Sequence, residues 1–380
     1  YAAVGRVVNV PVGVSSVKVG DMVACGGADA AHAEVLSVGM NLCAHVHEGT
    51  DPRHAALATI ASIALQGVRQ ADVRLGESVA VIGLGLIGQL TMQFLAAQGC
   101  TPIGLDIDSR QIELAKRCGF ANSYLSSDDS IVPAISDLTH GIGVDAVIIT
   151  AGTSSLVPVN MAGELCRRKG KVVIVGAVPT GFERKHYYRK ELDLRMSSSY
   201  GPGRYDPLYE EQGIDYPIGY VRWTEQRNMQ AYLDLLAAGK LNIEPLITHV
   251  FPLERSKEAY DMILAKKEHY CAVLLEYDQE QEIKGTVYRK GERRQERGGQ
   301  SVRAAFIGAG SFAQNMILPN LKGLVGFVGI STRHGNTSRY VMDKYGFDYA
   351  TDDPGKILAD ESVNTVFVMT RTETHARYVI

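Results

Sequence analysis

The sequence has 380 residues, of which 46% are apolar and 21% are charged, and its formal net charge is −3. This composition excludes a wholly disordered chain, because there is ample apolar side chain to bury, and it favours neither nucleic acid nor a membrane as a partner. No apolar run approaches the roughly 18 residues that a membrane-spanning helix needs.

The cysteines indicate the redox compartment of the protein, and the chain ends indicate whether the sequence is a fragment. The six cysteines form no C-x-x-C pair, so we expect free thiols in a reducing cytoplasm rather than a disulfide scaffold. The sequence begins at Tyr1, and residues 373–380 resemble the start of a helix, so we expect a fragment of a longer chain.

The chain begins with a β-rich stretch and continues with alternating strands and helices. Residues 1–50 are rich in valine and glycine and predict short strands and turns. After them, strands are predicted at 79–82, 102–106, 144–149 and 171–175, with helices at 86–97 and 109–118 and an amphipathic helix before the last strand. This alternation predicts an α/β fold, a parallel sheet with helices on both faces.

The last third of the chain repeats this arrangement after a charged segment. Helices are predicted at 224–238 and 256–265, and a strand at 271–277. The segment 279–301 is rich in charge and in glycine at its end, so we expect a linker there. At residue 303 the strand–helix–strand pattern restarts, which predicts two separate domains.

A glycine motif follows the predicted strand at 79–82 directly. In the sequence G-x-G-x-x-G, Gly83 allows a tight turn, Gly85 lets a pyrophosphate approach the backbone, and Gly88 allows close packing of helix on strand. The phosphates rest on free N–H groups at the helix start, where we expect Leu86 and Ile87 to contribute.

An acid at the end of the next strand indicates which dinucleotide the motif binds. Asp106 is the last residue of the predicted strand at 102–106, at the distance from Gly83 where a carboxylate holds the ribose hydroxyls of NAD. The glycine motif and this acid together predict an NAD site.

A second glycine motif follows the predicted strand at 303–307. Its expected cofactor-binding residues are Gly308, Gly310, Ser311 and Phe312, and Ala313 replaces the third glycine, which this motif tolerates. The residues and their context predict a second dinucleotide site.

The second motif lacks the acid of the first. Asp106 follows Gly83 by a fixed number of residues. The residue that follows Gly308 by the same number is Ser331, and Arg333 comes shortly after it. Without a carboxylate a 2′-phosphate is not repelled, and a guanidinium can pair with it. We therefore expect NADP or NAD here, with NADP favoured.

Residues 1–278 resemble the medium-chain dehydrogenase/reductase family. The resemblance rests on Asp106 and on the segments 17–24, 31–34, 83–88 and 170–176. It implies a β-rich, GroES-like catalytic domain at 1–68 and 246–278 that is incomplete at its N-terminus. It also implies an inserted NAD(P)-binding Rossmann domain at 69–245, with Gly176 among its cofactor contacts.

Residues 302–380 resemble the N-terminal Rossmann domain of the glucose–fructose oxidoreductase/inositol dehydrogenase family (Gfo/Idh/MocA). The resemblance rests on the segments 305–310, 363–368 and 374–376. The catalytic lysine of that family's Glu-Lys-Pro motif would lie beyond Ile380, so this domain is expected to be incomplete at its C-terminus.

The combination resembles bacterial oxidoreductases that fuse a threonine-dehydrogenase-like half to a Gfo/Idh/MocA half. The segments 199–206, 215–217 and 221–228 carry this likeness, whereas Thr372 stands where the group tends to have histidine. Such proteins are often linked to surface-polysaccharide or sugar metabolism, which implies a sugar or sugar derivative as substrate.

The same resemblance bears on catalytic zinc. The family's cysteine ligand would lie before Tyr1, its histidine position is taken by Tyr1, and its third-ligand position is taken by Ala58. Neither residue is a zinc ligand, so we expect no zinc and no other metal. His45 and His47 lie two residues apart but lack a third ligand, so a strand-edge role is favoured.

A run of tyrosines and arginines is the best candidate for the chemistry of a zinc-free site. Tyr200 and Arg204 are the first choices as catalytic residues in the run 200–227, because guanidinium groups bind phosphate or carboxylate and tyrosine can move a proton. A solvated face with a packing loop is the alternative. His186, Lys190 and Glu191 come next, with capping or local pairing as their alternative.

His375 is the candidate catalytic residue of the second domain. It follows the predicted strand at 365–369, at the carboxyl edge where nicotinamide and substrate meet in doubly wound folds. A structural role for this histidine is equally open.

Taken together, the sequence predicts NAD(P)-dependent hydride transfer to or from a small polar molecule. The alternatives are a zinc-free quinone or enone reductase and a non-catalytic dinucleotide sensor or assembly protein. Asp106 argues against a reductase that uses only NADPH. A homodimer is expected because dimers are common in such families.

Overall fold

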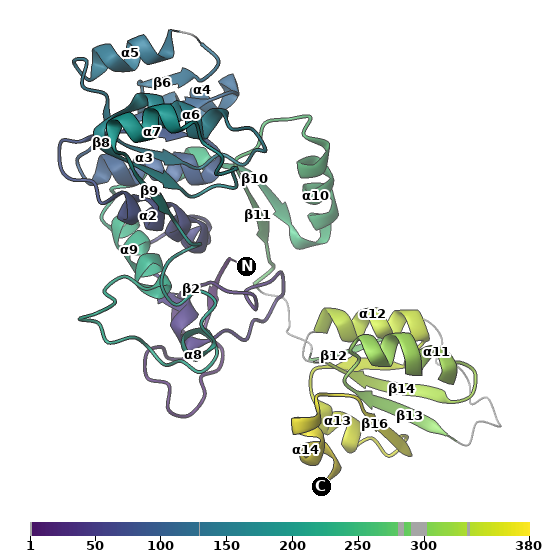
Figure 1. Cartoon of the computed structure of the whole chain (residues 1–380). Helices are drawn as coiled ribbons and strands as arrows, with labels where there is room; N and C mark the ends of the chain where they lie inside the picture. The colour runs from purple at the N-terminus through teal and green to yellow at the C-terminus, as the bar shows by residue number, and fades with distance from the viewer. Residues whose placement is uncertain (1, 129, 280–284, 290–301, 333–334) are drawn as a thin grey trace. The chain divides into compact units, whose positions relative to one another are not determined.

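The computed structural model describes residues 2–128, 130–279, 285–289, 302–332 and 335–380. They form two compact units, Tyr1–Gln279 and Glu280–Ile380, each of which is described by itself (Figure 1). Among the described residues no helix is both long enough and apolar enough to span a bilayer.

The first unit opens with a small antiparallel sheet. Its strands, in spatial order, are β1 (Ala3–Arg6), β2 (Met22–Cys25) and β3 (Cys43–His45). The helices α1 (Pro52–Ala55) and α2 (Ala58–Ala71) follow. Helix α1 begins where it does because the Asp51 side chain accepts a hydrogen bond from the Arg53 N–H, while Pro52 needs no acceptor.

A six-stranded parallel sheet is the largest element of the first unit. Its strand order is β6-β5-β4-β7-β8-β9. In chain order the strands are β4 (Ser78–Ile82), β5 (Thr101–Asp106), β6 (Ser123–Leu125), β7 (Val144–Ile149), β8 (Cys166–Ile174) and β9 (Asp193–Met196). The order reverses between β4 and β7, and ligands of such sheets bind at the carboxyl ends of the strands at this point.

Helices cover both faces of this sheet (Figure 1). The helices α2, α3 (Leu86–Ala97) and α4 (Ser109–Arg117) share one core with Val79 and Val81 of β4. The helices α5 (Ile131–Leu138), α6 (Val157–Leu165) and α7 (Arg184–Lys190) share the other core with Ala80 and Ile82. Burial on both faces explains why β4 is apolar in every position after its first.

The small sheet and the six-stranded sheet share the first of these cores. It contains Ala24 of β2, Ala44 of β3 and Leu233 of α9 (Glu225–Ala237). The short helix α8 (Pro207–Glu210) lies in the long segment between β9 and α9. Because α9 contacts both α2 and β3, this segment is anchored at the boundary of the two sheets.

The chain finishes the first unit with a separate parallel pair of strands. These are β10 (Ile247–Pro252) and β11 (Ala272–Glu276), joined by α10 (Ser256–Ala265). They form a two-stranded sheet of their own and add no strand to the small sheet of β1–β3.

The second unit contains a five-stranded sheet with the order β12-β15-β14-β13-β16. Its strands are β12 (Thr286–Tyr288), β13 (Arg303–Ile307), β14 (Gly326–Ser331), β15 (Tyr349–Thr351) and β16 (Thr365–Val368). Its helical elements are the π-helical η4 (Ala313–Ile317), α11 (Leu318–Leu321), α12 (Gly335–Tyr345), α13 (Pro354–Leu358) and α14 (His375–Val379).

The edge strand β12 comes from the segment that the sequence predicted as a linker. Thr286–Tyr288 pair antiparallel with β15, so this part of 279–301 belongs to the second sheet. The flanking residues 280–284 and 290–301 lie outside the described residues.

Candidate cofactor and substrate sites

The glycine turn of the first unit joins β4 to α3. Gly83 has a φ of +100°, and a Cβ there would lie 2.6 Å from the Ala151 backbone nitrogen. A Cβ on Gly88 would lie 1.9 Å from the Gly83 carbonyl oxygen, so helix and strand approach too closely for any side chain. Gly85, by contrast, faces open space and precedes α3 without a side-chain cap, which leaves room for a pyrophosphate.

Asp106, at the end of β5, points back toward this turn. Its Oδ2 accepts a hydrogen bond from the Leu84 N–H at 2.5 Å, and its Oδ1 accepts one from the Asp108 N–H at 2.8 Å. The carboxylate is therefore fixed next to the turn, where the adenosine ribose of a dinucleotide lies. The open space at Gly85, the uncapped helix start and this acid together fit a nicotinamide dinucleotide.

The ends of β7 and β8 lie on the other side of β4, at the same carboxyl edge of the sheet. A Cβ on Gly176, just beyond β8, would lie 2.1 Å from the Ala151 carbonyl oxygen. The Thr150 hydroxyl donates to the Gly83 carbonyl, so the ends of β7 and β4 are joined at the turn. Gly176 therefore lies at the sheet edge where the sequence placed a cofactor contact.

The segment after β9 brings Tyr200 and Arg204 together with a buried acid. Tyr200 and Glu225 are both fully buried, and the Tyr200 hydroxyl interacts with the Glu225 carboxyl closely enough to lower the pKa of that acid. The Arg204 guanidinium lies over the rings of Tyr200 and Tyr205. The complete burial of Tyr200 places it as a residue that positions its neighbours.

The electrostatics of this cluster are unusual. Burial raises the pKa of the Glu225 carboxyl from 4.5 to about 8, and the Glu210 carboxylate adds to the rise, whereas Arg204 and Tyr200 oppose it. Arg204 is ion-paired with Glu210 at 2.6 Å, so its charge is largely compensated. The surroundings of Glu225 therefore favour the protonated form of its carboxyl.

Sequence reasoning missed Glu225 as a member of this site. It follows Thr224, whose side chain caps α9, and an acid in the first turn of a helix is ordinarily a solvent-exposed partner of the helix dipole. Its burial comes from the loop after β9 folding over the helix start, where the Pro202 carbonyl accepts the Glu225 N–H. No local pattern signals this contact.

The second choices for catalysis lie on α7 or directly after it, and two of them have local structural partners. Lys190 donates to the carbonyl oxygens of Gly163, Glu164 and Cys166, so it caps the end of α6. Glu191 pairs with Lys169 at 2.8 Å. His186 is half-buried on α7. Cys166 begins β8, so Lys190 serves the amino edge of the sheet, opposite the cofactor turn.

The glycine turn of the second unit has the same construction as the first. Gly308 has a φ of +96°, and a Cβ there would lie 2.7 Å from Met369 backbone atoms, whereas Gly310 faces open space. Ser311 and Phe312 are exposed at the start of the following helix. A π-helical segment begins at Ala313, directly after this turn.

A cavity of about 270 Å³ lies in front of this second turn. Its walls are Gly310, Phe312, Ala313, Val368, Met369, Thr370 and His375. His375 Nε2 lies 3.0 Å from the Thr370 carbonyl oxygen, which can only accept, so Nε2 carries the hydrogen and Nδ1 is the ring acceptor. The structure thus places His375 beside the second dinucleotide turn.

The strand register corrects the residue expected at the ribose position of the second unit. The Gly83 N–H donates to the Leu105 carbonyl, and the Gly308 N–H donates to that of Ser331. Ser331 therefore corresponds to Leu105, is 2% exposed, and leaves Thr332 at the position of Asp106. The count failed because the second unit has one more residue between its first glycine and the residue whose carbonyl accepts the N–H of that glycine. Arg333 lies outside the described residues.

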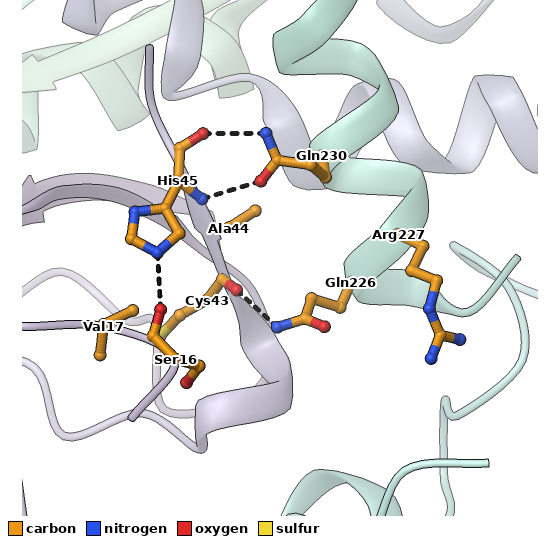
Figure 2. A pocket seen from close by; sticks show the side chains of 8 residues that line it. All are labelled: Ser16, Val17, Cys43, Ala44, His45, Gln226, Arg227 and Gln230. Atoms are coloured by element: carbon orange, nitrogen blue, oxygen red, sulfur yellow. Dashed lines mark hydrogen bonds between the residues drawn. The ribbon is translucent and has the colours of Figure 1, made fainter. Parts of the chain in front are cut away.

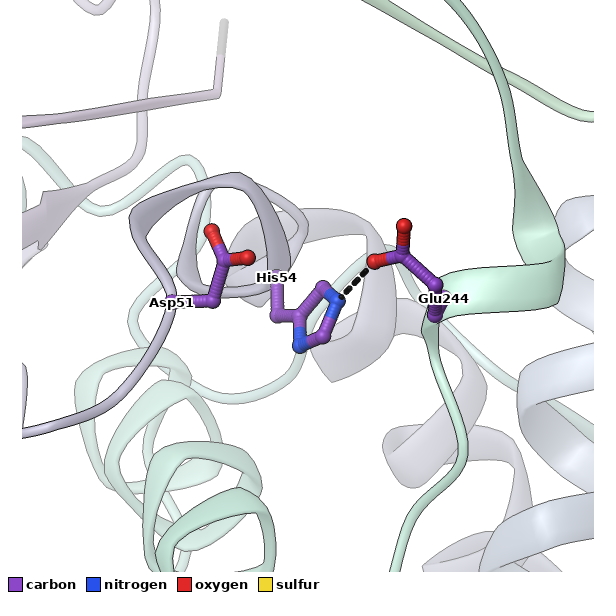
Figure 3. A group of neighbouring side chains, drawn as sticks. All are labelled: Asp51, His54 and Glu244. Carbon is purple, nitrogen blue, oxygen red and sulfur yellow. Dashed lines mark hydrogen bonds and ion pairs between the residues drawn. The ribbon is translucent and has the colours of Figure 1, made fainter.

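One of the two zinc-ligand positions that the sequence resemblance implies, Ala58, lies among the described residues. Ala58 is buried in the core and has no donor atom, and Tyr1 lies outside the described residues. One group of potential ligands lies close together among them, namely Asp51, His54 and Glu244 (Figure 3). Arg53 pairs with both of these carboxylates, at 2.7 and 3.1 Å, which opposes cation binding.

A cavity of about 180 Å³ between β3 and α9 has a structural explanation (Figure 2). The Gln230 side chain exchanges hydrogen bonds with the His45 backbone, and Gln226 donates to the Cys43 carbonyl. His45 Nε2 lies 2.6 Å from the Ser16 carbonyl. The polar groups of this cavity thus fasten α9 to the edge of β3.

Two family descriptions match separate parts of the chain. Residues 87–212 match the zinc-binding dehydrogenase family, and residues 302–380 match an oxidoreductase family described by its NAD-binding Rossmann fold (Gfo/Idh/MocA). The first match contains most of the six-stranded sheet, and the second contains the glycine turn with His375.

Similar proteins include sugar and polyol dehydrogenases. A D-guloside 3-dehydrogenase from Escherichia coli is 27% identical over 261 residues, covering 68% of this chain and 71% of the relative. A sorbitol dehydrogenase from Halalkalibacterium halodurans is 28% identical over 225 residues, 58% of each chain.

A solved structure shows the same fold in the first unit. An alcohol dehydrogenase from a Thermus species superposes with a TM-score of 0.57 at 22% identity, covering 72% of this chain and 82% of its own. The fold, the family matches and the relatives agree, and the chain is an NAD(P)-dependent dehydrogenase.

Proposed function

We propose that the chain transfers hydride between NAD and a carbinol or carbonyl carbon of a sugar or sugar derivative, without a catalytic zinc ion. The observation that carries the proposal is the Asp106 carboxylate, held at the glycine turn by the backbone N–H groups of Leu84 and Asp108. A carboxylate in this position favours the two free ribose hydroxyls of NAD and repels the 2′-phosphate of NADP.

The substrate class is supported by the relatives. Their names specify a D-guloside and sorbitol as substrates, and both are polyhydroxylated molecules. The proposed role in surface-polysaccharide metabolism is supported by the sequence resemblance alone. A cytoplasmic homodimer that acts on a small molecule is part of the same proposal.

Different residues of the first unit are proposed to bind the cofactor and to position the substrate. When bound, the nicotinamide ring accepts or donates the hydride. The turn at Gly85 and the start of α3 bind the pyrophosphate, and Asp106 orients the ribose. Tyr200 and Arg204 on the loop after β9, and Glu225 at the start of α9, are proposed as positioning residues, with the raised pKa of Glu225 favouring its protonated form.

The second unit is proposed to bind NADP or NAD at its own turn. Gly310 leaves the space for the pyrophosphate, and the Asp106 position is taken by Thr332, so a 2′-phosphate meets no carboxylate there. His375 is proposed to contact the nicotinamide or the substrate through Nδ1. Arg333 remains a proposed partner of the 2′-phosphate.

A substrate screen tests this function directly. The purified chain is incubated with NAD and a panel of polyols, glycosides and sugar acids, and NADH formation is followed by its absorbance. We expect turnover of at least one sugar-like compound and at least a tenfold lower rate in Asp106→Ala at limiting NAD, because a charge-assisted hydrogen bond contributes about 1.5–3 kcal/mol. Reduction of quinones or enones with NADPH, and no oxidation of any sugar, would contradict the proposal.

A further inference from the structure

Two arginines lie against the single tryptophan of the chain, beside the loop that follows β9. The Arg69 guanidinium carbon lies 3.5 Å from the centroid of the Trp223 ring, and that of Arg222 lies 3.9 Å from it. Arg69 is half-buried on α2, and Arg222 is exposed before α9. Two positive charges are therefore held close together by one indole.

Arg69 is fixed in its orientation by a buried neighbour. Its Nε donates to Asn228 Oδ1 at 2.7 Å, and Asn228, which is fully buried, donates to the Tyr200 carbonyl at 3.0 Å. This bond uses the inner side of the guanidinium and leaves its terminal nitrogens without a protein acceptor among the described residues. The bond to Asn228 and the contact with the Trp223 ring thus hold the Arg69 guanidinium in one orientation.

The charge of this pair is uncompensated. Among the described residues no carboxylate lies within 4.0 Å of Arg69 or Arg222, although Arg195, Arg204 and Arg227 nearby each have an acidic partner. Burial lowers the pKa of Arg69 to about 10, with the Arg222 charge adding to the fall, so Arg69 stays positive at neutral pH. An anion placed here would relieve this repulsion.

The strand order separates this pair from the expected cofactor phosphates. The Gln70 carbonyl on α2 accepts a hydrogen bond from the Arg195 side chain of β9, and the Asp72 carbonyl just after α2 accepts one from Lys171 of β8, so the end of α2 lies on the β8–β9 side of the sheet. β9 is three strands from β4, which bears the pyrophosphate turn, and four from β5, which bears Asp106. At about 4.8 Å per strand these separations are roughly 14 and 19 Å. A site at this end of α2 is therefore expected to be separate from the cofactor phosphates.

We propose that Arg69 and Arg222, stacked on Trp223, bind an oxyanion carried by the substrate, a phosphate ester or a carboxylate of a sugar derivative. The guanidinium groups bind such an oxyanion through paired N–H donors. The inference rests on the proposed function for the identity of the ligand as a substrate, whereas the anion site itself is testable without turnover.

Trp223 provides the measurement, because it is the only tryptophan in the sequence. The intact chain, free of cofactor, is titrated at constant ionic strength with inorganic phosphate, glucose 6-phosphate, glucuronate and glucose, and tryptophan fluorescence is recorded. We expect a saturable change with glucose 6-phosphate or glucuronate at about 1 mM or below, and none with glucose. The stronger of the two ligands tells whether the substrate carries phosphate or carboxylate.

Variants assign the signal to the two arginines. Arg222→Gln should weaken oxyanion binding about tenfold, the loss of one charge-assisted contact, and Arg69→Lys should weaken it by removing the planar fork. Arg168→Gln, which removes an exposed arginine of β8 that has no contact with Trp223, is the matched control and should leave binding unchanged. The proposal is overturned if no oxyanion gives a saturable change, or if both Arg222→Gln and Arg69→Lys bind as the wild type does.

The fluorescence titration and the substrate screen test the anion site and the enzyme function separately, so either can fail without the other. A saturable oxyanion signal without dehydrogenase activity keeps the anion site and removes the proposed sugar oxidation. Sugar oxidation without an oxyanion signal keeps the enzyme function and overturns this site.

Discussion

The Asp106 carboxylate accepts the Leu84 N–H at 2.5 Å, across the glycine turn that separates β4 from α3. This bond joins the end of β5 to the turn and fixes the acid before any cofactor arrives. A ribose hydroxyl that binds Asp106 therefore meets a prepositioned acceptor, and little side-chain entropy is lost on binding.

Two neighbouring glycines should separate cofactor binding from folding. In Gly85→Ala the new methyl group enters open space, so the melting temperature of the cofactor-free chain should change little while NADH affinity falls at least tenfold. In Gly88→Ala the methyl group would lie 1.9 Å from the Gly83 carbonyl, so the chain should lose about 1–3 kcal/mol of stability. Thermal unfolding and calorimetric titration measure both quantities. Wild-type NADH affinity in Gly85→Ala would refute the placement of the pyrophosphate.

The buried Glu225 should make stability fall with rising pH. Its pKa is raised from 4.5 to about 8, so the folded state binds the proton more tightly than the unfolded state does. The resulting stabilisation is complete below about pH 4.5 and is lost as the pH rises toward 8, by at most about 5 kcal/mol. Denaturant unfolding at several pH values measures this slope.

The variant Glu225→Gln isolates that effect, since it keeps the side-chain shape without a titratable group. Its stability relative to the wild type should increase steadily from about pH 5 to 8. Tyr200, Arg204 and Glu210 face Glu225 and remain unchanged in this comparison. A constant difference between the two proteins across this range would show that Glu225 has an ordinary pKa.

The second turn should bind a second dinucleotide independently of the first. In Gly310→Ala the methyl group occupies the open space in front of the turn, so the number of cofactor sites measured by calorimetry should fall from two to one. The remaining site should prefer NADH, because it is the Asp106 site. An unchanged stoichiometry in this variant would contradict a cofactor site in the second unit.

Removal of metal should leave the first unit's activity intact. Ala58 offers no ligand, and both carboxylates beside His54 are engaged by Arg53. We expect dialysis against a strong chelator to change the rate of sugar oxidation by less than about twofold, because no step depends on a bound cation. Loss of activity that zinc restores would contradict the zinc-free proposal.

The sequence predicted the elements around the first turn well, since their signals are local. The helix α3 begins and ends at the predicted residues 86 and 97, and β7 and α10 also match their predictions. About 20 consecutive residues contain the apolar strand, the glycine turn and the helix that follows it. No contact with a distant part of the chain is therefore needed to recognise these elements. The strand β8, however, begins at Cys166, ahead of its predicted start at 171.

The features that sequence reasoning missed all depend on distant contacts. β12 is a short strand that forms because β15, far along the chain, pairs with it. Glu225 is buried by a loop, and Arg69 meets Trp223 from a helix in a much earlier part of the chain. The position of Thr332 depends on strand register, which a fixed residue count does not capture.

The central claim is best tested by calorimetric titration of NADH and NADPH into Gly310→Ala, with and without Asp106→Ala. Gly310→Ala should abolish binding at the second site, so the heat of binding comes from the first glycine turn alone. We expect NADH to bind at least tenfold more tightly than NADPH, and Asp106→Ala to remove this preference. Equal affinity for both dinucleotides before Asp106 is changed, or no binding at all, would contradict the central claim.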